Sequence, residues 1–423
     1  MLKAGSLFYA VAIAILFALI SSSLILYSYF NSLQFQYNLQ MQRMQLNATS
    51  GINLLLSKQE IIKANEKKTF DLFDGNEDPI LMERKSWGAF EIGICKAFWK
   101  MDTLKQIFQM GYAIHPANRF AIYLADQIKP LSLCGKTIIK GDCYLPRAGV
   151  ERAYIEGESF VGDKFIDGTV KESKKTLPAI NKELIKSIGS LFSIYEGGDN
   201  SNFSLMRLAD QGENPIHNSF QNKTLCLYDK NDIYLGKKSI EGNILIVSGK
   251  KIKVSADNKL LDVILAAPKI EIEEGFKGNI QAFATDTLII GQKCQLTYPS
   301  VICVIRNNKY SPDSLLLKVG EGAEINGVLF GYQEDKSVEK LLLVQTGKHS
   351  IVTGQIYSDG SVDIKGSVYG SVICNKFIVI SPSSGYENHL LNATIDNTKL
   401  SDNFISSSLI EQSENKKVAK WLY

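Results

Sequence analysis

The sequence predicts a mainly β protein that is carried on one N-terminal transmembrane α-helix and contains a small antiparallel β unit followed by a β-solenoid. Three observations support this fold class. An apolar run extends from Leu7 to Phe30, strand-like alternation begins at Trp87, and a short glycine-centred unit recurs between Ile139 and Val368. With 423 residues, the chain is long enough for an anchor and two or three globular units of about 100–200 residues each.

The N-terminal run has the length and composition of a membrane span. Lys3 and Arg43 are the first two charged residues, and four serines interrupt the otherwise apolar or small residues of the run. A bilayer core needs about 20 apolar residues in helical form, whereas the apolar region of a cleavable secretion signal spans roughly 7–15 residues. The segment Asn31–Gln34 is also a poor processing site. We therefore expect residues 6–30 to form a transmembrane helix that anchors the protein.

The distribution of basic residues predicts the orientation of this anchor. The N-terminal side carries only Lys3 and the amino terminus, and the basic residues after the span begin at Arg43, well away from the membrane. Loop charge influences orientation, and a short tail ahead of a long downstream segment usually stays in the cytoplasm. We expect a bacterial single-pass protein of the inner (cell) membrane, with a cytoplasmic N-terminus and a periplasmic or extracellular bulk.

The helix is expected to continue beyond the membrane as an amphipathic extension through residues 31–57. No proline occurs before Pro79, and apolar side chains recur at steps of three and four, with polar residues on much of the other face. The resulting stripe consists of Leu33, Tyr37, Met41, Met44, Ala48, Ile52 and Leu55. Such a stripe packs either against the protein's own globular part or against other subunits. The sequence leaves both interpretations open.

The first residues resemble the start of type IV pilin-like proteins. Lys3-Ala4-Gly5 is followed at once by Ser6 and the long apolar helix. In this family a short basic leader ends in glycine and a membrane peptidase cuts after it, so the resemblance implies a leader of residues 1–5 and processing between Gly5 and Ser6. Major pilins have glutamate at the fifth mature position, where this chain has Ala10, and in this respect it resembles minor, tip-located pseudopilins. A plain signal anchor is the alternative.

The remaining chain divides by composition. Residues 58–86 are rich in Lys, Glu, Asp and Asn and are expected to form a solvated connector. Alternating, β-favouring segments predict a small β-rich unit over residues 87–134, with its aromatic side chains in the core. The solenoid is expected over residues 135–395, interrupted at residues 177–222 by an amphipathic helix and a polar surface loop. Residues 396–423 form a polar tail that is either disordered or used for docking.

The recurring unit apolar-x-Gly-x-apolar-or-small is the evidence for the solenoid. Its copies are centred on Gly141, Gly157, Gly242, Gly278, Gly327, Gly354 and Gly366. Alternating runs between the copies bury every second side chain, and glycine permits tight corners between short strands. The stretch Ile351–Cys374 resembles the repeat of bactofilins, which are polymer-forming scaffold proteins, and the resemblance covers roughly residues 236–385. It implies a right-handed β-solenoid. A β-sandwich with glycine turns is the alternative.

Cysteine, histidine and charge patterns argue against metal and nucleic-acid binding. The seven cysteines form no C-x-x-C motif and the four histidines are scattered, whereas structural zinc sites need clustered ligands. Cys134 and Cys143 could close a hairpin disulfide in an oxidising compartment, and the other cysteines are expected to be small core residues. The net charge is +3, with Lys and Glu interspersed, so we expect no nucleic-acid partner. We predict neither a metal nor a cofactor.

The sequence also lacks the patterns of a catalytic site. Glycan-cleaving β-helices need grouped carboxylates. The aspartates of the solenoid region are sparse: Asp257, Asp262, Asp286, Asp313, Asp359 and Asp363. Only Asp359 and Asp363 are close together, and because Gly360 is expected to mark a corner between them, we interpret both as solvated turn residues. No G-x-S-x-G elbow, P-loop or H-E-x-x-H motif occurs. We predict that the protein is not an enzyme.

The sequence therefore predicts a non-catalytic, membrane-anchored structural component of a pilus- or secretion-type cell-envelope assembly, either a minor pilin-like subunit or an adaptor. Its expected partners are membrane lipid and either other envelope or pilus-like subunits or further copies of the same chain. One alternative is a bactofilin-like polymerising scaffold tethered to the membrane. Another is a surface β-helix that binds or cleaves carbohydrate.

Overall fold

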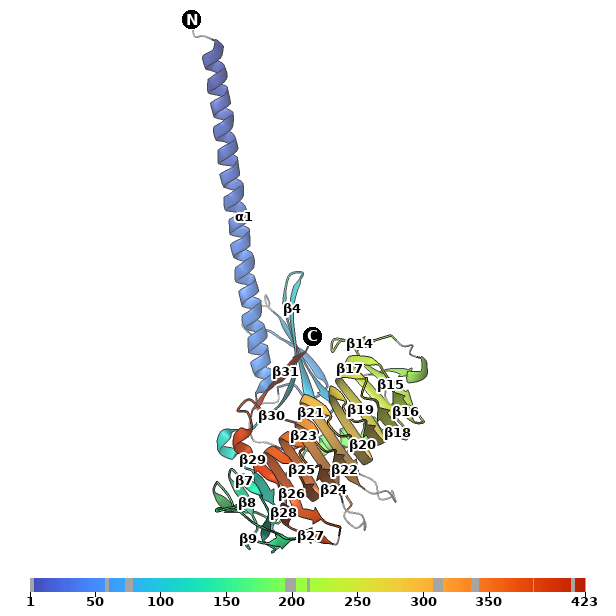
Figure 1. Cartoon of the computed structure of the whole chain (residues 1–423). Helices are drawn as coiled ribbons and strands as arrows, with labels where there is room; N and C mark the ends of the chain where they lie inside the picture. Colours follow the sequence, from blue (N-terminus) through green and yellow to red (C-terminus); the bar gives the residue numbers. More distant parts are fainter. Residues whose placement is uncertain are drawn as a thin grey trace. The chain divides into compact units, whose positions relative to one another are not determined.

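One long helix precedes all the β-structure of the chain (Figure 1). The computed structural model describes residues 4–57, 61–72, 79–194, 203–210, 214–306, 315–335, 342–382, 384–411 and 415–422. These residues form two compact units. Unit 1 consists of Met1–Leu55, Gln59–Arg84 and Gly93–Gln106, and unit 2 consists of Leu56–Lys58, Lys85–Ile92 and Ile107–Tyr423.

Helix α1 (Ala4–Leu56) runs without a break through both the predicted transmembrane segment and its predicted extension. It has 53 residues, which corresponds to about 80 Å at a rise of about 1.5 Å per residue. The described side chains from Gly5 to Leu39 are all exposed. The structure therefore contains one helix that is long and apolar enough to cross a membrane, and the protein itself covers none of its most apolar part.

The last turns of α1 pack within unit 1. Met44, Ala48, Ile52 and Leu55 are buried. Gly51 lies so close to the strands of this unit that a Cβ there would meet the side chains of Ile80, Met82 and Cys95. The Cys95 thiol donates a hydrogen bond to the Ala48 carbonyl over 3.4 Å. Glycine and alanine thus allow the helix to approach the sheet closely.

An antiparallel sheet has the strand order β1-β2-β3-β4-β30, with β31 also paired to β4. Its strands are β1 (Glu66–Phe70), β2 (Ile80–Trp87), β3 (Phe90–Trp99), β4 (Asp102–Ala113), β30 (Ile405–Ser406) and β31 (Lys416–Leu422). Two of these strands lie in the predicted connector 58–86, which is therefore not simply a loop. Strand β1 is an edge strand with Lys67 and Lys68 exposed, and charged edge strands resemble loops in composition. Residues 58–60 and 73–78 of the connector lie outside the described part.

A second, closed sheet makes up most of unit 2 (Figure 1), and its neighbouring strands run parallel except for the β26–β27 pair. Its early strands are β5 (Ile122–Leu124), β7 (Ile138–Lys140), β8 (Cys143–Leu145), β12 (Val170–Glu172), β13 (Phe203–Arg207), β14 (Ile216–Asn218), β15 (Thr224–Asp229), β16 (Ile233–Leu235), β17 (Ser239–Ser248) and β18 (Lys251–Val254). Its later strands are β19 (Lys259–Ile272), β20 (Lys277–Ile290), β21 (Gln295–Arg306), β22 (Leu316–Val319), β23 (Glu324–Gln333), β24 (Leu343–Thr346), β25 (Ile351–Ile364), β26 (Ser367–Ile380), β27 (Gly385–Glu387) and β29 (Thr394–Asp396). The prediction of a mainly β protein with one long N-terminal apolar helix is confirmed.

The core of this sheet is built from columns of apolar side chains in register. One column passes from strand to strand through Leu227, Ile246, Leu265, Ala282, Ile302, Leu329, Ile356, Val372, Ile122 and Cys143. All ten side chains are fully buried. Strand alternation turns every second residue inward. Because the parallel strands pair in register, each apolar side chain stacks on another apolar side chain, and water is excluded along the whole column.

The order of strands in space differs from their order in the sequence. Strand β26 pairs with β5, so that Val372 lies beside Ile122, and β5 pairs in turn with β8. Along the chain, the parallel sheet therefore begins at β5 rather than at residue 135. Within residues 87–134 the antiparallel strands end with β4, so these residues do not form one unit. The sequence does not show this, because no local pattern indicates that the partner of a strand lies about 250 residues away. A separate three-stranded sheet has the order β28-β6-β9, from β28 (His389–Leu391), β6 (Leu131–Cys134) and β9 (Val150–Arg152), and β10 (Tyr154–Ile155) pairs with β11 (Glu158–Ser159).

The predicted insertion at residues 177–222 contains the expected helix. Helix α2 (Lys182–Leu191) begins at Asn181, whose side chain accepts a hydrogen bond from the Leu184 amide over 3.0 Å. Its apolar face is buried through Leu184, Ile185 and Ile188. The following segment is not only a surface loop, because β13 and β14 add to the parallel sheet. Strand β13 is mostly exposed, which explains why its composition looks like a loop. Residues 195–202 and 211–213 lie outside the described part.

The described residues of the C-terminal tail are ordered. Strand β31 pairs with β4, and Lys416 Nζ lies 2.8 Å from Glu91 Oε2, while Lys420 Nζ lies 2.6 Å from Asp262 Oδ1. The alternative of a disordered tail is therefore wrong for these residues, which pair with the protein's own sheet. In the sequence these polar side chains look solvated, but in the structure the ammonium groups of Lys416 and Lys420 pair with carboxylates from distant strands.

Candidate functional site

The carboxylates of the parallel sheet form individual structural contacts. Asp286 Oδ1 lies 2.9 Å from Arg306 Nη2 in a buried ion pair, and Asp262 pairs with Lys420 of β31. Asp257 is exposed, and Asp313 lies outside the described residues. These side chains do not form a convergent acid–base pair in the part of the chain that the structure describes.

Asp359 and Asp363 are not solvated turn residues, and this prediction is corrected. They are 8% and 1% exposed, and both lie within strand β25. Asp359 Oδ1 accepts a hydrogen bond from the Gln333 amide over 3.1 Å. Asp363 Oδ2 accepts one from Gln345 Nε2 over 2.8 Å and lies 3.3 Å from Lys365 Nζ. Burial raises the pKa of Asp363, although Gln345 and Lys365 oppose this shift. The register of the sheet shifts between Ser358 and Ser361, so Gly360 marks an irregularity inside the strand.

A groove lies beside the segment that leads into α2. This α2 groove has a volume of about 910 Å³ and is lined by residues 175–183 together with Tyr112, Tyr332, Tyr357, Asp359, Asn375 and Glu411. Tyr357 stacks on Phe330 with ring centroids 4.9 Å apart, and its hydroxyl donates to the Pro178 carbonyl over 3.4 Å. Burial raises the pKa of Tyr332, with smaller contributions from Glu334 and Asp359.

The lining of the α2 groove combines aromatic, amide and charged side chains. Phenol rings offer apolar faces, and carboxylates and amides offer hydrogen-bonding groups of the kind that specify polar ligands. Asn375 Nδ2 is occupied by a hydrogen bond to the Asp359 carbonyl. No local pattern predicts this groove, because its lining comes from six separate parts of the chain.

The predicted processing residues lie inside helix α1. Gly5 and Ser6 are exposed, and nothing lies within 4 Å of the position a Cβ would take at Gly5. Residues 1–3 of the predicted leader lie outside the described part. The described residues thus leave the surroundings of Gly5 open, and processing between Gly5 and Ser6 stays a prediction.

The predicted packing stripe divides into two parts. Met44, Ala48, Ile52 and Leu55 are buried within unit 1 and Met41 is half-buried, whereas Leu33 and Tyr37 are 43% and 44% exposed. Packing against the protein's own globular part is thus seen for the last turns of the helix, and packing of the earlier turns against other subunits stays a prediction. The lower turns pack on the protein's own sheet, and the upper turns leave apolar side chains uncovered.

Cys134 and Cys143 do not form the predicted disulfide. All seven cysteines are free and buried. Cys134 lies on β6 in a small apolar cluster, while Cys143 lies on β8 in the main core. Burial raises the pKa of Cys134 to about 11 and that of Cys143 to about 12. Short sequence separation suggested a hairpin, but the two residues belong to different sheets.

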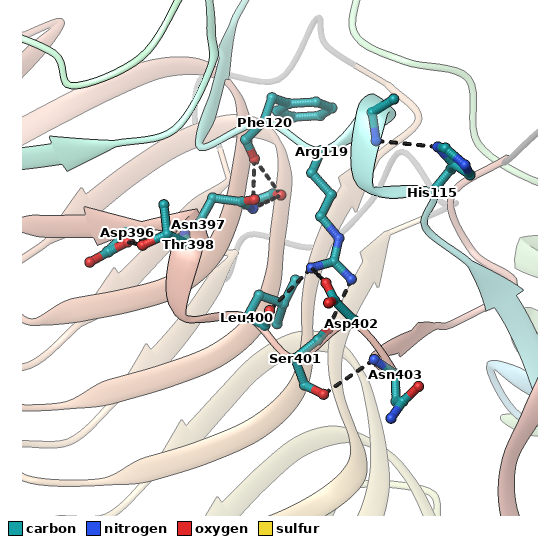
Figure 2. A network of polar contacts seen from close by, with 12 residues as sticks. His115, Arg119, Phe120, Asp396, Asn397, Thr398, Leu400, Ser401, Asp402 and Asn403 are labelled. Carbon is teal, nitrogen blue, oxygen red and sulfur yellow. Dashed lines mark hydrogen bonds and ion pairs between the residues drawn. The ribbon is translucent and has the colours of Figure 1, made fainter.

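A network of polar contacts that the sequence did not reveal holds the segment after β29 in place (Figure 2). Arg119 Nη1 donates to the Leu400 carbonyl over 3.1 Å and to Asp402 Oδ1 over 3.0 Å, and Nη2 donates to the Ser401 carbonyl over 2.9 Å. Asn397 Nδ2 donates to the Phe120 carbonyl over 3.0 Å. These partners are about 280 residues apart in the sequence. The network therefore has a structural role, because it fixes the path of the chain between β29 and β30.

Among the described residues, no group of histidine, cysteine, aspartate or glutamate side chains is arranged to hold a metal ion. No protein-family model, curated protein or solved structure matches the chain. The interpretation of function therefore depends on the geometry above and on the sequence.

Proposed function

We propose that the protein is a non-catalytic, single-pass membrane-anchored component of a pilus- or secretion-type cell-envelope assembly, acting as a minor pilin-like subunit or adaptor. Helix α1 would cross the inner membrane with its N-terminus in the cytoplasm. The closed parallel sheet would be a right-handed β-solenoid in the periplasm or outside the cell, serving as a rigid body that presents surfaces to partners.

The single observation that carries this proposal is that the apolar side chains in the first part of α1 are exposed. An exposed helix of this hydropathy is unfavourable in water, because each uncovered apolar side chain forgoes about 1.5–3 kcal/mol of burial. Its upper turns, including Leu33 and Tyr37, remain apolar and uncovered. Lipid covers the first part, and neighbouring helices of an assembly would cover the second.

N-terminal mass analysis of the membrane-extracted full chain tests the pilin-like version. In a strain with an active prepilin peptidase, the mature protein should begin at Ser6, and a Gly5→Val variant should remain uncut. A matched Ala10→Val variant, which changes a nearby exposed position, should be processed normally. A mature N-terminus at Met1 in the unmodified protein would refute processing and leave the plain anchor.

A polymerising, membrane-tethered scaffold is the second candidate. The strands of the parallel sheet stack in register, as β23, β25 and β26 do, and strands of this kind pair with another chain wherever an edge is left open. Size measurement of the detergent-solubilised full chain distinguishes this candidate. Concentration-dependent filaments would support it, whereas a monomer at all concentrations would contradict it.

A surface carbohydrate-binding protein is the third candidate, favoured by the tyrosines and carboxylates of the α2 groove. Titration of the full chain with cell-envelope oligosaccharides, followed by calorimetry, tests it. Binding should be lost in Tyr332→Ala and retained in Tyr234→Ala, which changes an exposed tyrosine that does not line the groove. Equal binding by both variants would remove the groove from consideration.

A further inference from the structure

The β3–β4 hairpin of unit 1 ends beside helix α1 (Figure 1). Its two-residue tip is Lys100-Met101, and Lys100 has a φ of 51°. The ring centroid of Trp99 lies 6.3 Å from that of Tyr37 on α1 in an edge-to-face arrangement. The tip therefore lies at the level of Tyr37, and this level is fixed because helix and hairpin belong to the same compact unit.

The apolar run of α1 places this level relative to a bilayer. The run from Leu7 to Phe30 is centred between Ala18 and Leu19. Half of a complete bilayer, including its headgroups, measures about 20–22 Å, which corresponds to about 14 residues of helix. Counted from Ala18, this distance ends at Ser32, and Tyr37 lies about 8 Å further along the helix. The hairpin tip would thus lie at the outer edge of the headgroup layer, on the side of the membrane where the globular part lies, and the long side chains of Lys100 and Met101 would extend into that layer.

The composition of the tip suits that layer. Met101 is 97% exposed, and Lys100 Nζ lies 4.8 Å from the centroid of the Trp99 ring. Tryptophan and tyrosine are enriched at membrane–water interfaces, and lysine is attracted to anionic headgroups. The charged side chains on the same hairpin are Glu91, Lys96, Lys100, Asp102 and Lys105; three lysines against two carboxylates leave its net charge positive.

We propose that the tip Trp99-Lys100-Met101 is a second membrane contact, which seats unit 1 on the phospholipid headgroup layer from which α1 emerges. This inference rests on the proposed anchoring by α1. A lone helix would let the unit swivel about its axis. Contact at a second point, with Met101 in the lipid interface and Lys100 at phosphate, restricts that rotation and the tilt of unit 1.

Site-specific fluorescence in vesicles tests the contact. The full chain with Met101→Cys is labelled with an environment-sensitive dye and reconstituted into phosphatidylethanolamine–phosphatidylglycerol vesicles that contain a headgroup nitroxide quencher. All seven native thiols are buried, which directs the label to the new cysteine. The matched control is Ile61→Cys, at a residue of the same unit that is 37% exposed and follows the C-terminal end of α1, away from the apolar run. We expect quenching at position 101 to exceed that at position 61 by at least about twofold, as for an interfacial side chain.

Alkaline extraction of the same vesicles separates the two proposals. Equal quenching at both positions, in protein that resists extraction, would overturn the hairpin contact and leave the anchor intact. Release of the protein by alkali would overturn the anchor and the hairpin contact together. A further variant, Lys100→Glu in the labelled Met101→Cys background, should lower the quenching because it reverses the attraction to phosphatidylglycerol.

Discussion

At the scale of single residues, glycines set how closely the strands of the parallel sheet stack. Gly327, Gly354 and Gly370 are paired in register and have φ values of 149°, 144° and 153°. A Cβ on Gly354 would collide with the Gly327 carbonyl, and one on Gly370 with the Gly354 carbonyl. Glycine is required in this column for two reasons: the backbone has a positive φ, and there is no room for a side chain.

Replacement of Gly354 by alanine should therefore destabilise the protein more than replacement of Gly275. Both glycines have positive φ, but nothing lies within 4 Å of a Cβ on Gly275. We expect Gly275→Ala to lower the free energy of unfolding by about 1–2 kcal/mol, from backbone strain alone. Gly354→Ala should cost at least ~3 kcal/mol, because the clash adds to strain of this kind. Chemical unfolding of the detergent-solubilised full chain measures both, and equal costs would contradict a stacking role.

Asp363 predicts a pH dependence of stability. Its pKa is raised from the usual 3.8 by burial, so folding favours the protonated carboxyl. The stabilisation is fully present below the unfolded pKa and is lost as pH rises through the raised folded pKa. Asp363→Asn should therefore be more stable than the parent protein at pH 7 and show no such gain at pH 3. Thermal unfolding across this range measures the difference, and a parallel decline in both proteins would exclude Asp363 as the source.

At the scale of elements, the antiparallel sheet is completed by the end of the chain. Strand β31 pairs with β4, and the Lys416 ammonium is 7% exposed beside the Glu91 carboxylate. An ion pair with so little solvent contact loses much when one partner is removed, since the other charge stays buried. The strand is thus held by a specific charge match in addition to its backbone hydrogen bonds.

Lys416→Met should destabilise the protein by about 3 kcal/mol, because it leaves the Glu91 carboxylate without this cation. Lys417→Met is the matched control, since Lys417 is exposed on the same strand and should change stability little. Unfolding midpoints of the two full-length variants make the comparison. If Lys416→Met were as stable as Lys417→Met, the charge match would not hold the strand.

At the scale of the whole molecule, the chain combines a helix that is apolar enough to span a membrane with β-structure that has its own buried core. The most apolar part of α1 is not buried by the protein, so changes there should affect location without affecting the fold. The strands after α1 in contrast bury large apolar side chains, such as Phe90, Phe283 and Phe330. This separation allows the anchor to be tested on the intact protein.

The double variant Leu16→Lys and Leu19→Lys should leave the membrane fraction. Both leucines are exposed in the middle of the apolar run, and each lysine near a helix centre costs about 2.5–3.5 kcal/mol on insertion. The matched control is Gln34→Lys with Gln36→Lys, on the same helix beyond the run, which should stay membrane-bound. Fractionation with alkaline extraction measures location, and an unchanged unfolding temperature checks the fold. Retention of the leucine variant in the membrane would show that lipid contact by α1 is not what holds the protein.

Local patterns carried the prediction of the helix and of the β-class. The apolar run from Leu7 to Phe30 and the amphipathic stretch after it predict α1, and the spacing of Ile180, Leu184 and Ile188 predicts α2, because burial on a helix repeats with its turn. Glycine between alternating apolar residues indicates stacked short strands. These features depend only on neighbours in the chain, and the sequence displays them directly.

The tertiary structure alone decided which distant parts meet. Ile122 pairs with Val372, Lys416 neutralises Glu91, and the α2 groove assembles from separate segments. The same lack of local signal explains why the prediction of a Cys134–Cys143 disulfide is wrong. Near the end of the chain, the sequence pattern of a polar residue that water solvates is the same as that of a polar residue that pairs with a buried countercharge. Only the folded geometry distinguishes the two, because the countercharge comes from hundreds of residues away.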